Sequence, residues 1–114
     1  MTEILNLEYN GPDRRRSPRL QWDVGLVVRM DLPGQDNFQE RTFTITVSAH
    51  GALVLLAAKV EMGQKLFLLN PLTGMEVEGR VVRFGSPHGG LSVVGVEFLE
   101  PSAEFWPWPE KEKL

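Results

Sequence analysis

The sequence predicts an all-β domain in which six short antiparallel strands form a sandwich or a small barrel. Strand-like segments recur about every ten residues, and turn residues separate them. The chain has 114 residues, enough for one domain, and 42% of them are hydrophobic, enough for a single core. A barrel would also remove the exposed strand edges that an open sheet leaves.

The first two strands are predicted from alternation. From Trp22 onward, apolar residues alternate with other residues along 24–30, the period of a half-buried strand. Turn residues follow at 33–37, which reads Pro-Gly-Gln-Asp-Asn. The second strand covers 43–48, where Phe, Ile and Val alternate with Thr and Ser. A tight turn follows, in which Gly51 is available for a positive φ angle.

The later strands are predicted from shorter signals. Residues 52–58 are apolar on both faces, which favours a fully covered strand over a buried helix because the run is short. Further strands are expected at 64–69, 75–84 and 93–98, each separated from the next by glycine- and proline-containing turns. In 75–84, the charged residues Glu76, Glu78 and Arg80 occupy every second position and are expected to point outward. Val82 and Phe84 continue the same series of positions. We therefore expect a bulge near Gly79 or burial of both faces.

The two ends of the chain are expected to lie outside the barrel. Residues 1–20 are predicted to form a flexible, extended arm, because glycine and proline residues interrupt regular structure there. The barrel then spans 21–106. It is expected to end in a short C-terminal helical turn, with Ser102 as N-cap, before a tail at 107–114.

Composition and charge exclude several classes of function. The absence of cysteine excludes disulfide frameworks, thiolate metal sites and cysteine nucleophiles. The net charge of −3 argues against a general nucleic-acid binder. Four arginines nevertheless lie within 14–19, which indicates a local anion site. No signal peptide or membrane-spanning stretch is recognisable, so a cytoplasmic protein without membrane association is expected.

The residues that could do chemistry form no catalytic pattern. His50 and His88 lie in glycine-flanked turns without the spacing of a metal site. Glu76 and Glu78 share a strand face, which is more typical of a solvated surface than of an acid–base pair. Ser48 has no His and Asp pattern to activate it. The chain is therefore predicted to be a binding protein that needs no cofactor, and not an enzyme.

Two segments carry the residue types of an anion-binding site. Arg15 and Arg19 lie four residues apart, and a guanidinium group can hold a phosphate or the O6/N7 edge of guanine. Thr46 and Ser48 place two hydroxyls on one strand face directly before the turn at Gly51. If the arm folds across this strand end, guanidinium groups, hydroxyls and turn amides converge on one anion. The alternatives are a solvated arm and an ordinary strand end.

Together these segments resemble the two-part signature of PilZ domains. Arg15-x-x-x-Arg19 is followed later in the chain by Thr46-x-Ser48-x-x-Gly51, and the family pattern is Arg-x-x-x-Arg, then Asp or Asn-x-Ser-x-x-Gly. Residues 95–98 are similar to the last barrel strand of the family. The resemblance implies a six-stranded antiparallel PilZ-like barrel that binds the bacterial second messenger cyclic di-GMP.

The resemblance also implies roles for individual residues. Arg15 and Arg19 would contact the guanine edges and phosphates of the ligand, and Ser48 would hydrogen-bond near its phosphate or guanine. Gly51 would allow the turn and a close backbone approach. His50 lies in the same turn and is counted with the site.

Two further positions modify the expected binding. Arg14 resembles the arginine that, in the family, accompanies binding of two stacked ligand molecules. The resemblance therefore implies that two ligand molecules bind here. Thr46 replaces the Asp or Asn of the family, and one hydroxyl accepts less well from guanine N1–H and N2–H2. Loss of such a contact weakens binding by about 1–3 kcal/mol.

The predicted function is that of a bacterial cyclic di-GMP receptor or adaptor. Ligand binding would order the N-terminal arm and so signal to an effector protein that is not identified. The alternative is a degenerate PilZ-like module with weak or no nucleotide binding, which would hold a protein through Phe105, Trp106 and Trp108. A nucleic-acid binder with steep salt dependence is the third interpretation.

Overall fold

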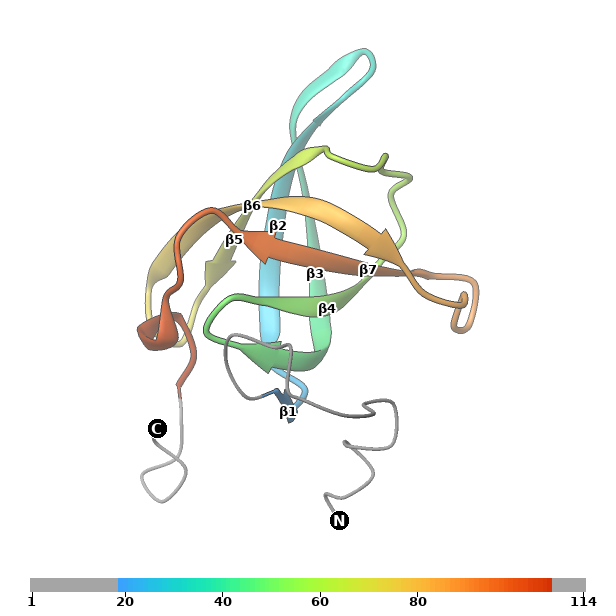
Figure 1. Ribbon diagram of the computed structural model, residues 1–114. Helices are drawn as coiled ribbons and strands as arrows, with labels where there is room; N and C mark the ends of the chain where they lie inside the picture. The colour runs from blue at the N-terminus through green and yellow to red at the C-terminus, as the bar shows by residue number, and fades with distance from the viewer. Residues whose placement is uncertain (1–18, 108–114) are drawn as a thin grey trace.

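The computed structural model describes residues 19–107, which form a closed β-barrel (Figure 1). The strands are β1 (Leu20–Gln21), β2 (Gly25–Leu32), β3 (Gln35–Ser48), β4 (Gly51–Leu56), β5 (Lys65–Asn70), β6 (Met75–Phe84) and β7 (Ser92–Phe98). A 3-10 turn, η2 (Ala103–Phe105), follows the last strand. The predicted all-β class, the six-stranded barrel and the C-terminal helical turn are confirmed. The short strand β1 is additional.

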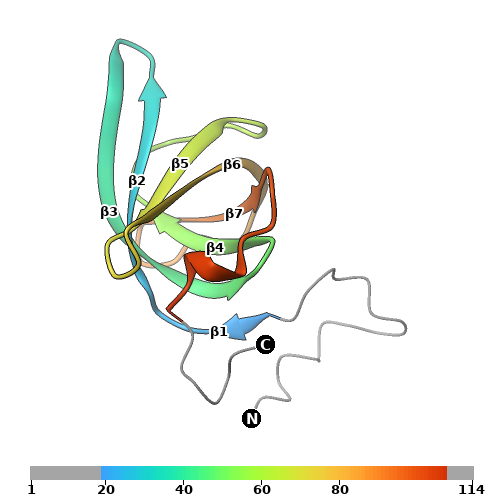
Figure 2. The ribbon, with the colours of Figure 1, turned by 90° about the vertical axis from the view of Figure 1, so that its left-hand side faces the viewer.

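Six strands form the ring of the barrel. They pair in the order β3-β2-β5-β6-β7-β4, and a pairing between β3 and β4 closes the ring. All pairings are antiparallel. β1 lies at the edge of this ring, where it pairs with β3 (Figure 2). The β2–β3 hairpin projects from one end of the molecule, whereas β1 and η2 lie toward the other (Figures 1 and 2).

β2 shows the predicted alternation, but the hairpin turn after it is shorter than predicted. Leu26, Val28 and Met30 are buried, and the residues between them are partly exposed. The turn consists of Pro33–Gly34 alone, because Gln35–Asn37 already belongs to β3. An irregularity in the β2–β3 ladder accommodates the other turn-type residues.

β3 changes its inward face at a bulge. Thr42 and Thr44 are buried, whereas Phe43 between them is 59% exposed. Both threonine hydroxyls donate hydrogen bonds to backbone carbonyls, which satisfies them inside the barrel wall. The register with β4 then shifts between Thr44 and Thr46, and beyond the shift Val47 is buried. The sequence predicts one alternating pattern along this strand. Because of the bulge, the buried positions are Thr42 and Thr44 before it and Val47 after it.

The bulge predicted in β6 is present, but it lies nearer the end of the strand. The register with β7 shifts between Val81 and Arg83. Val82 and Phe84 are each 45% exposed, so the alternative of burial on both faces is wrong. Gly79 serves a different purpose, since a Cβ atom there would lie 2.8 Å from a backbone carbonyl oxygen of β7.

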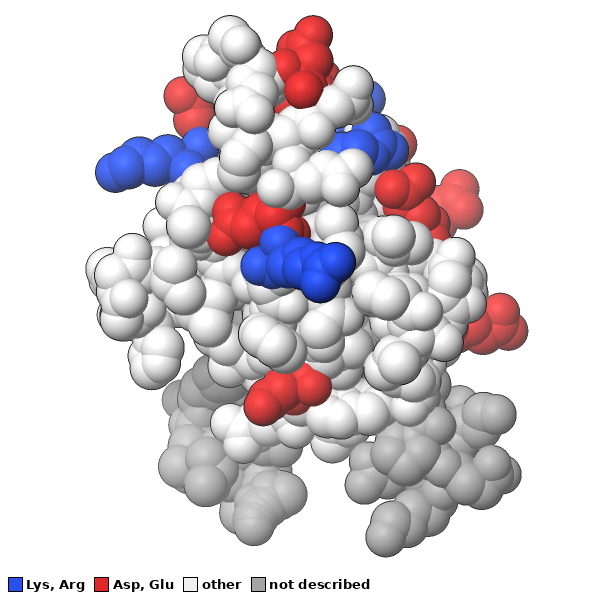
Figure 3. Space-filling model, turned by 180° about the vertical axis from the view of Figure 1, so that it is seen from behind, with Lys and Arg blue, Asp and Glu red and all other residues white. Residues whose placement is uncertain are grey.

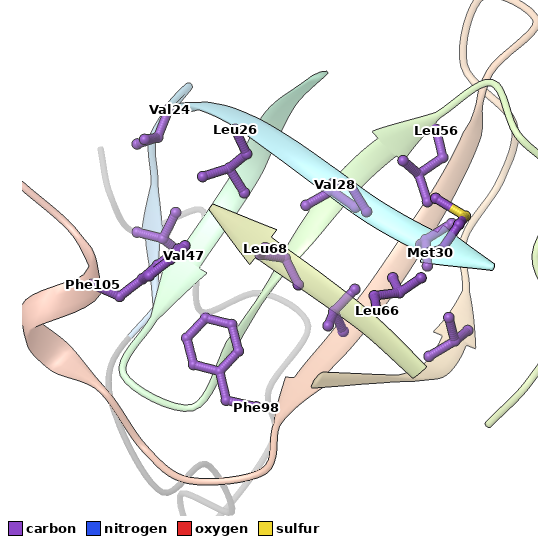
Figure 4. Close-up of a cluster of buried hydrophobic side chains, with 14 of the residues drawn as sticks. Val24, Leu26, Val28, Met30, Val47, Leu56, Leu66, Leu68, Phe98 and Phe105 are labelled. Atoms are coloured by element: carbon purple, nitrogen blue, oxygen red, sulfur yellow. The ribbon is translucent and has the colours of Figure 1, made fainter. Parts of the chain in front are cut away.

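Aliphatic side chains from the barrel strands fill the interior, and aromatic rings close the end beside η2 (Figure 4). Phe105 contacts Phe98 and Trp106 edge-on, with ring centroids 5.5 Å and 4.7 Å away. Phe105 is fully buried and Trp106 is 2% exposed. The expectation that these two residues form an exposed contact patch is therefore wrong, because they cover the open end of the core. Trp108 lies outside the described residues.

The C-terminal segment is fastened to the barrel by hydrogen bonds. The carbonyl oxygen of Phe105 accepts from the side-chain amide of Asn70 (2.8 Å) and from the hydroxyl of Thr73 (3.1 Å). Ser102 precedes η2 but makes no side-chain capping bond, contrary to the expected N-cap. Its N–H donates instead to the carbonyl of Ala49, at 2.7 Å. The segment is thus tied to two separate turns of the barrel.

Candidate ligand-binding site

β1 brings the second arginine of the Arg-x-x-x-Arg motif beside the strand that carries the hydroxyls. Gln21 is the pairing partner of Thr46 in the β1–β3 ladder. Arg19 is half-buried and directly precedes β1, which begins at Leu20, the pairing partner of Val47. The structure therefore brings the segment that carries one motif arginine alongside the strand that carries both motif hydroxyls.

The shared face of these residues is the outer wall of the barrel. The neighbouring pair in the ladder is Leu20 and Val47. Val47 is 1% exposed and Leu20 packs against the core, so this pair points inward. Because side chains alternate across a strand, the flanking pairs point outward. Arg14 and Arg15 lie outside the described residues, so their positions relative to this wall stay predictions.

Ser48 orders the turn between β3 and β4. It is 9% exposed, and its Oγ atom accepts a hydrogen bond from the backbone N–H of His50 at 3.1 Å. Such a serine turn fixes the backbone two residues onward. The hydroxyl proton of Ser48 stays available for a second hydrogen bond, because a hydroxyl both accepts and donates. His50 itself is half-buried at the turn.

The C-terminal part of the barrel braces the same turn. Each carbonyl of residues 48–50 accepts one hydrogen bond from it. In chain order, the donors are the indole N–H of Trp106 (2.7 Å), the N–H of Ser102 (2.7 Å) and the N–H of Phe98 (2.8 Å). The sequence analysis missed this brace, because contacts between residues 58 positions apart leave no local pattern.

Gly51 is required by a close contact between strands. A Cβ atom on Gly51 would lie 2.1 Å from the carbonyl oxygen of Val96 in β7, closer than any side chain tolerates. The predicted positive φ is wrong, since the positive φ angles within residues 19–107 occur at other glycines and at Asn37. The close backbone approach expected here is present, and it joins β4 to β7.

A cleft also lies away from this wall. It has a volume of about 290 Å³, lies near the base of the β2–β3 hairpin and is lined by Arg29, Met30, Asp31, Asn37, Gln64, Lys65 and Phe67. Arg29 stacks on Phe67 at 4.3 Å and pairs with Glu76 at 3.4 Å, so its charge is already compensated. None of the motif residues lines this cleft, which makes it a weaker candidate for an anion.

Three further observations concern surface charge, metal-ligating residues and helix length. The face shown in Figure 3 carries basic and acidic side chains interspersed, without a broad basic field among the residues described there. Between residues 19 and 107, no group of three or more His, Cys, Asp or Glu residues is placed to hold a metal ion. No helix in that range is long and apolar enough to cross a bilayer.

The fold is a closed β-barrel, and the candidate site lies on its outer wall. The family model of the PilZ domain matches residues 13–105. This match spans most of the chain, and the chain therefore belongs to the PilZ domain family.

Solved structures show the same fold at low sequence identity. The inhibitor of motility MotI/DgrA of Bacillus subtilis is 23% identical with a TM-score of 0.65, covering 81% of this chain and 45% of that one. YcgR of Escherichia coli in complex with c-di-GMP is 18% identical with a TM-score of 0.56, covering 75% and 38%.

The separately solved PilZ domain of YcgR with c-di-GMP is 16% identical with a TM-score of 0.56, covering 76% and 79%. This chain thus spans less than half of the MotI and YcgR chains in the first two structures. A search of curated proteins by sequence gave no match.

Proposed function

We propose that this chain is a receptor or adaptor domain that binds cyclic di-GMP and has no catalytic activity. The observation that supports the proposal is the β1–β3 pairing, which brings the segment directly after Arg19 alongside Thr46 and Val47 in a PilZ barrel. The ligand is supported by YcgR, whose PilZ domain was solved with c-di-GMP. A permanently charged guanidinium next to hydroxyl groups suits the phosphates and guanine edges of this dinucleotide.

Each motif residue has a role in this proposal. Arg15 and Arg19 hold the phosphates and guanine edges, and Ser48 donates its hydroxyl proton to the ligand. His50 and Gly51 keep the turn in shape beneath the ligand. Arg14 holds a second, stacked ligand molecule.

The signal passes to a partner through the N-terminal arm. Residues 1–20 act as an arm next to the barrel of residues 21–106, and 107–114 form a tail. Leu20 is already paired with Val47, so the ligand orders the part of the arm that precedes β1. The new surface is recognised by an effector protein in the bacterial cytoplasm, without membrane or nucleic acid. The alternative, a module that holds a protein through its C-terminal aromatic residues, loses support because Phe105 and Trp106 are buried.

Replacing Arg19 by alanine is expected to lower the affinity for cyclic di-GMP by about ten- to a hundredfold, the cost of one bidentate guanine contact. Isothermal titration of the native chain and the variant measures this change. Arg29→Ala is the matched control, because Arg29 is also a half-buried arginine but lies in β2, toward the β2–β3 hairpin end. It should bind like the native chain. Equal affinity of Arg19→Ala and the native chain, or no binding by the native chain at tens of micromolar ligand, would contradict the proposal.

A further inference from the structure

The family signature is incomplete at Thr46, and the structure places a glutamine directly across from that position. Gln21 and Thr46 are partners in the β1–β3 ladder. Residues directly opposite each other in an antiparallel pair have Cα atoms about 4.5–5.5 Å apart, and their side chains share a face. Gln21 is exposed and Thr46 is half-buried, so the longer side chain extends further from the wall.

The chemistry of the two side chains differs in the property that guanine recognition needs. A threonine hydroxyl offers a single oxygen, whereas a glutamine carboxamide combines a carbonyl acceptor with two N–H donors. Guanine carries the donors N1–H and N2–H2 next to the acceptor O6 on one edge. A glutamine carboxamide can accept from these donors and donate to O6, as an Asn side chain can, whereas an Asp carboxylate only accepts.

The row of outward-facing residues that contains Thr46 crosses two further strands. Across β4 and β7, the row that contains Thr46 continues through Leu53 to Gly95. Leu53 is half-buried, and Gly95 has no side chain of its own. Arg83 lies across Gly95, since a Cβ atom there would meet the Cγ atom of Arg83 at 2.7 Å. The row therefore has Leu53 and Gly95 in its middle, with the polar side chain of Thr46 at one end and that of Arg83 at the other.

We propose that Gln21 supplies the guanine-reading group that the PilZ signature otherwise places at the position of Thr46. Gln21 faces Thr46 in the ladder, and Arg19 lies two residues earlier on the same segment, directly before β1. Gln21 thus selects the base while Arg19 binds charge or the other guanine edge. This inference rests on the proposed function and adds to it the residue that gives base specificity.

The test compares two dinucleotides that differ at the edge which Gln21 reads. Gln21→Ala is expected to weaken binding of cyclic di-GMP by about ten- to a hundredfold. Binding of cyclic di-AMP, which lacks N1–H and the N2 amino group, should change less than threefold. The dissociation constant for cyclic di-AMP divided by that for cyclic di-GMP, both from isothermal titration, therefore falls by at least about threefold. Gln39→Ala, at an exposed glutamine elsewhere in β3, is the control and should leave the ratio unchanged.

A second variant separates base reading from a general effect on the site. In the Gln21→Ala background, Thr46→Asp should restore at least tenfold in cyclic di-GMP affinity, because the carboxylate accepts from the same guanine donors. In the native background the same change should give much less, since two groups that serve one partner are not additive. Urea unfolding of all variants should give equal midpoints, because position 21 is exposed and position 46 half-buried.

Three outcomes overturn the inference. If Gln21→Ala binds cyclic di-GMP like the native chain while Arg19→Ala still loses affinity, the role of Gln21 is refuted and the proposed function stands. Equal losses for both dinucleotides show that Gln21 does not read the base. Absence of binding by the native chain refutes the proposed function and this inference together.

Discussion

Gly51→Ala is expected to lower the free energy of unfolding by about 3 kcal/mol, a large cost for adding one methyl group to a small barrel. The new Cβ atom would lie 2.1 Å from the carbonyl oxygen of Val96 and 3.2 Å from the Cα atom of Glu97. Both are backbone atoms, so no change of rotamer relieves the contact. β4 and β7 must separate at their first pairing, between Gly51 and Glu97. Urea denaturation monitored by circular dichroism measures the change.

Gly25→Ala is the matched control for this experiment. Gly25 also begins a strand, and a Cβ atom there would meet only the ring of Phe43, at an ordinary contact distance of 3.7 Å. Its unfolding free energy should change by about 1 kcal/mol or less. If Gly51→Ala unfolds at the same urea concentration as the Gly25 control, the close contact between β4 and β7 is not what requires this glycine.

Phe105→Ala is expected to lower the free energy of unfolding by about 3–5 kcal/mol, the usual cost of deleting a buried aromatic ring. Phe105 is fully buried, and its ring packs edge-on against both Phe98 and Trp106. The cavity would open at the end of the barrel that these rings close. Thermal and urea unfolding of the native chain and the variant give the difference.

Phe43→Ala tests whether loss of any phenylalanine has this effect. Phe43 is 59% exposed on the outer face of β3, so its removal should cost about 1 kcal/mol or less. Phe105→Ala should also weaken cyclic di-GMP binding at temperatures where it is folded. The reason is that Trp106, which holds the carbonyl of Ser48, loses its packing partner. A Phe105 variant as stable as Phe43→Ala would show that the aromatic cluster does not support the barrel.

The sequence was sufficient to predict the fold because most strands bury one face. The alternation along β2 and the apolar run of β4 are both visible within one segment of the sequence, and both result from burial against the core. The bulge in β3 was not predictable, since it exchanges the inward and outward faces between Thr44 and Thr46 without any break in the pattern. β1 was missed as well, because a strand of two residues has no period.

The candidate site was predictable in its residue types and not in its architecture. The chemistry of guanidinium and hydroxyl groups can be read from the sequence alone, so Arg19, Thr46 and Ser48 could be predicted as site residues, and their part in binding stays a prediction. A close backbone approach at Gly51 was expected, but its partner, the carbonyl of Val96 on another strand, was not predictable. Gln21 gave no signal either, since its relevance depends on a pairing register that only the folded chain defines.

The brace on the β3–β4 turn has a consequence for how this site can evolve. Two of its three hydrogen bonds join main-chain atoms on both sides, at Ala49 and His50. Mutations that change these two side chains leave those bonds intact, so homologous chains can diverge at these positions while keeping the loop conformation. The third bond depends on an indole, and only a donor at the position of Trp106 preserves it. Substitutions are therefore better tolerated at Ala49, in the turn itself, than at Trp106, whose side chain supports the turn.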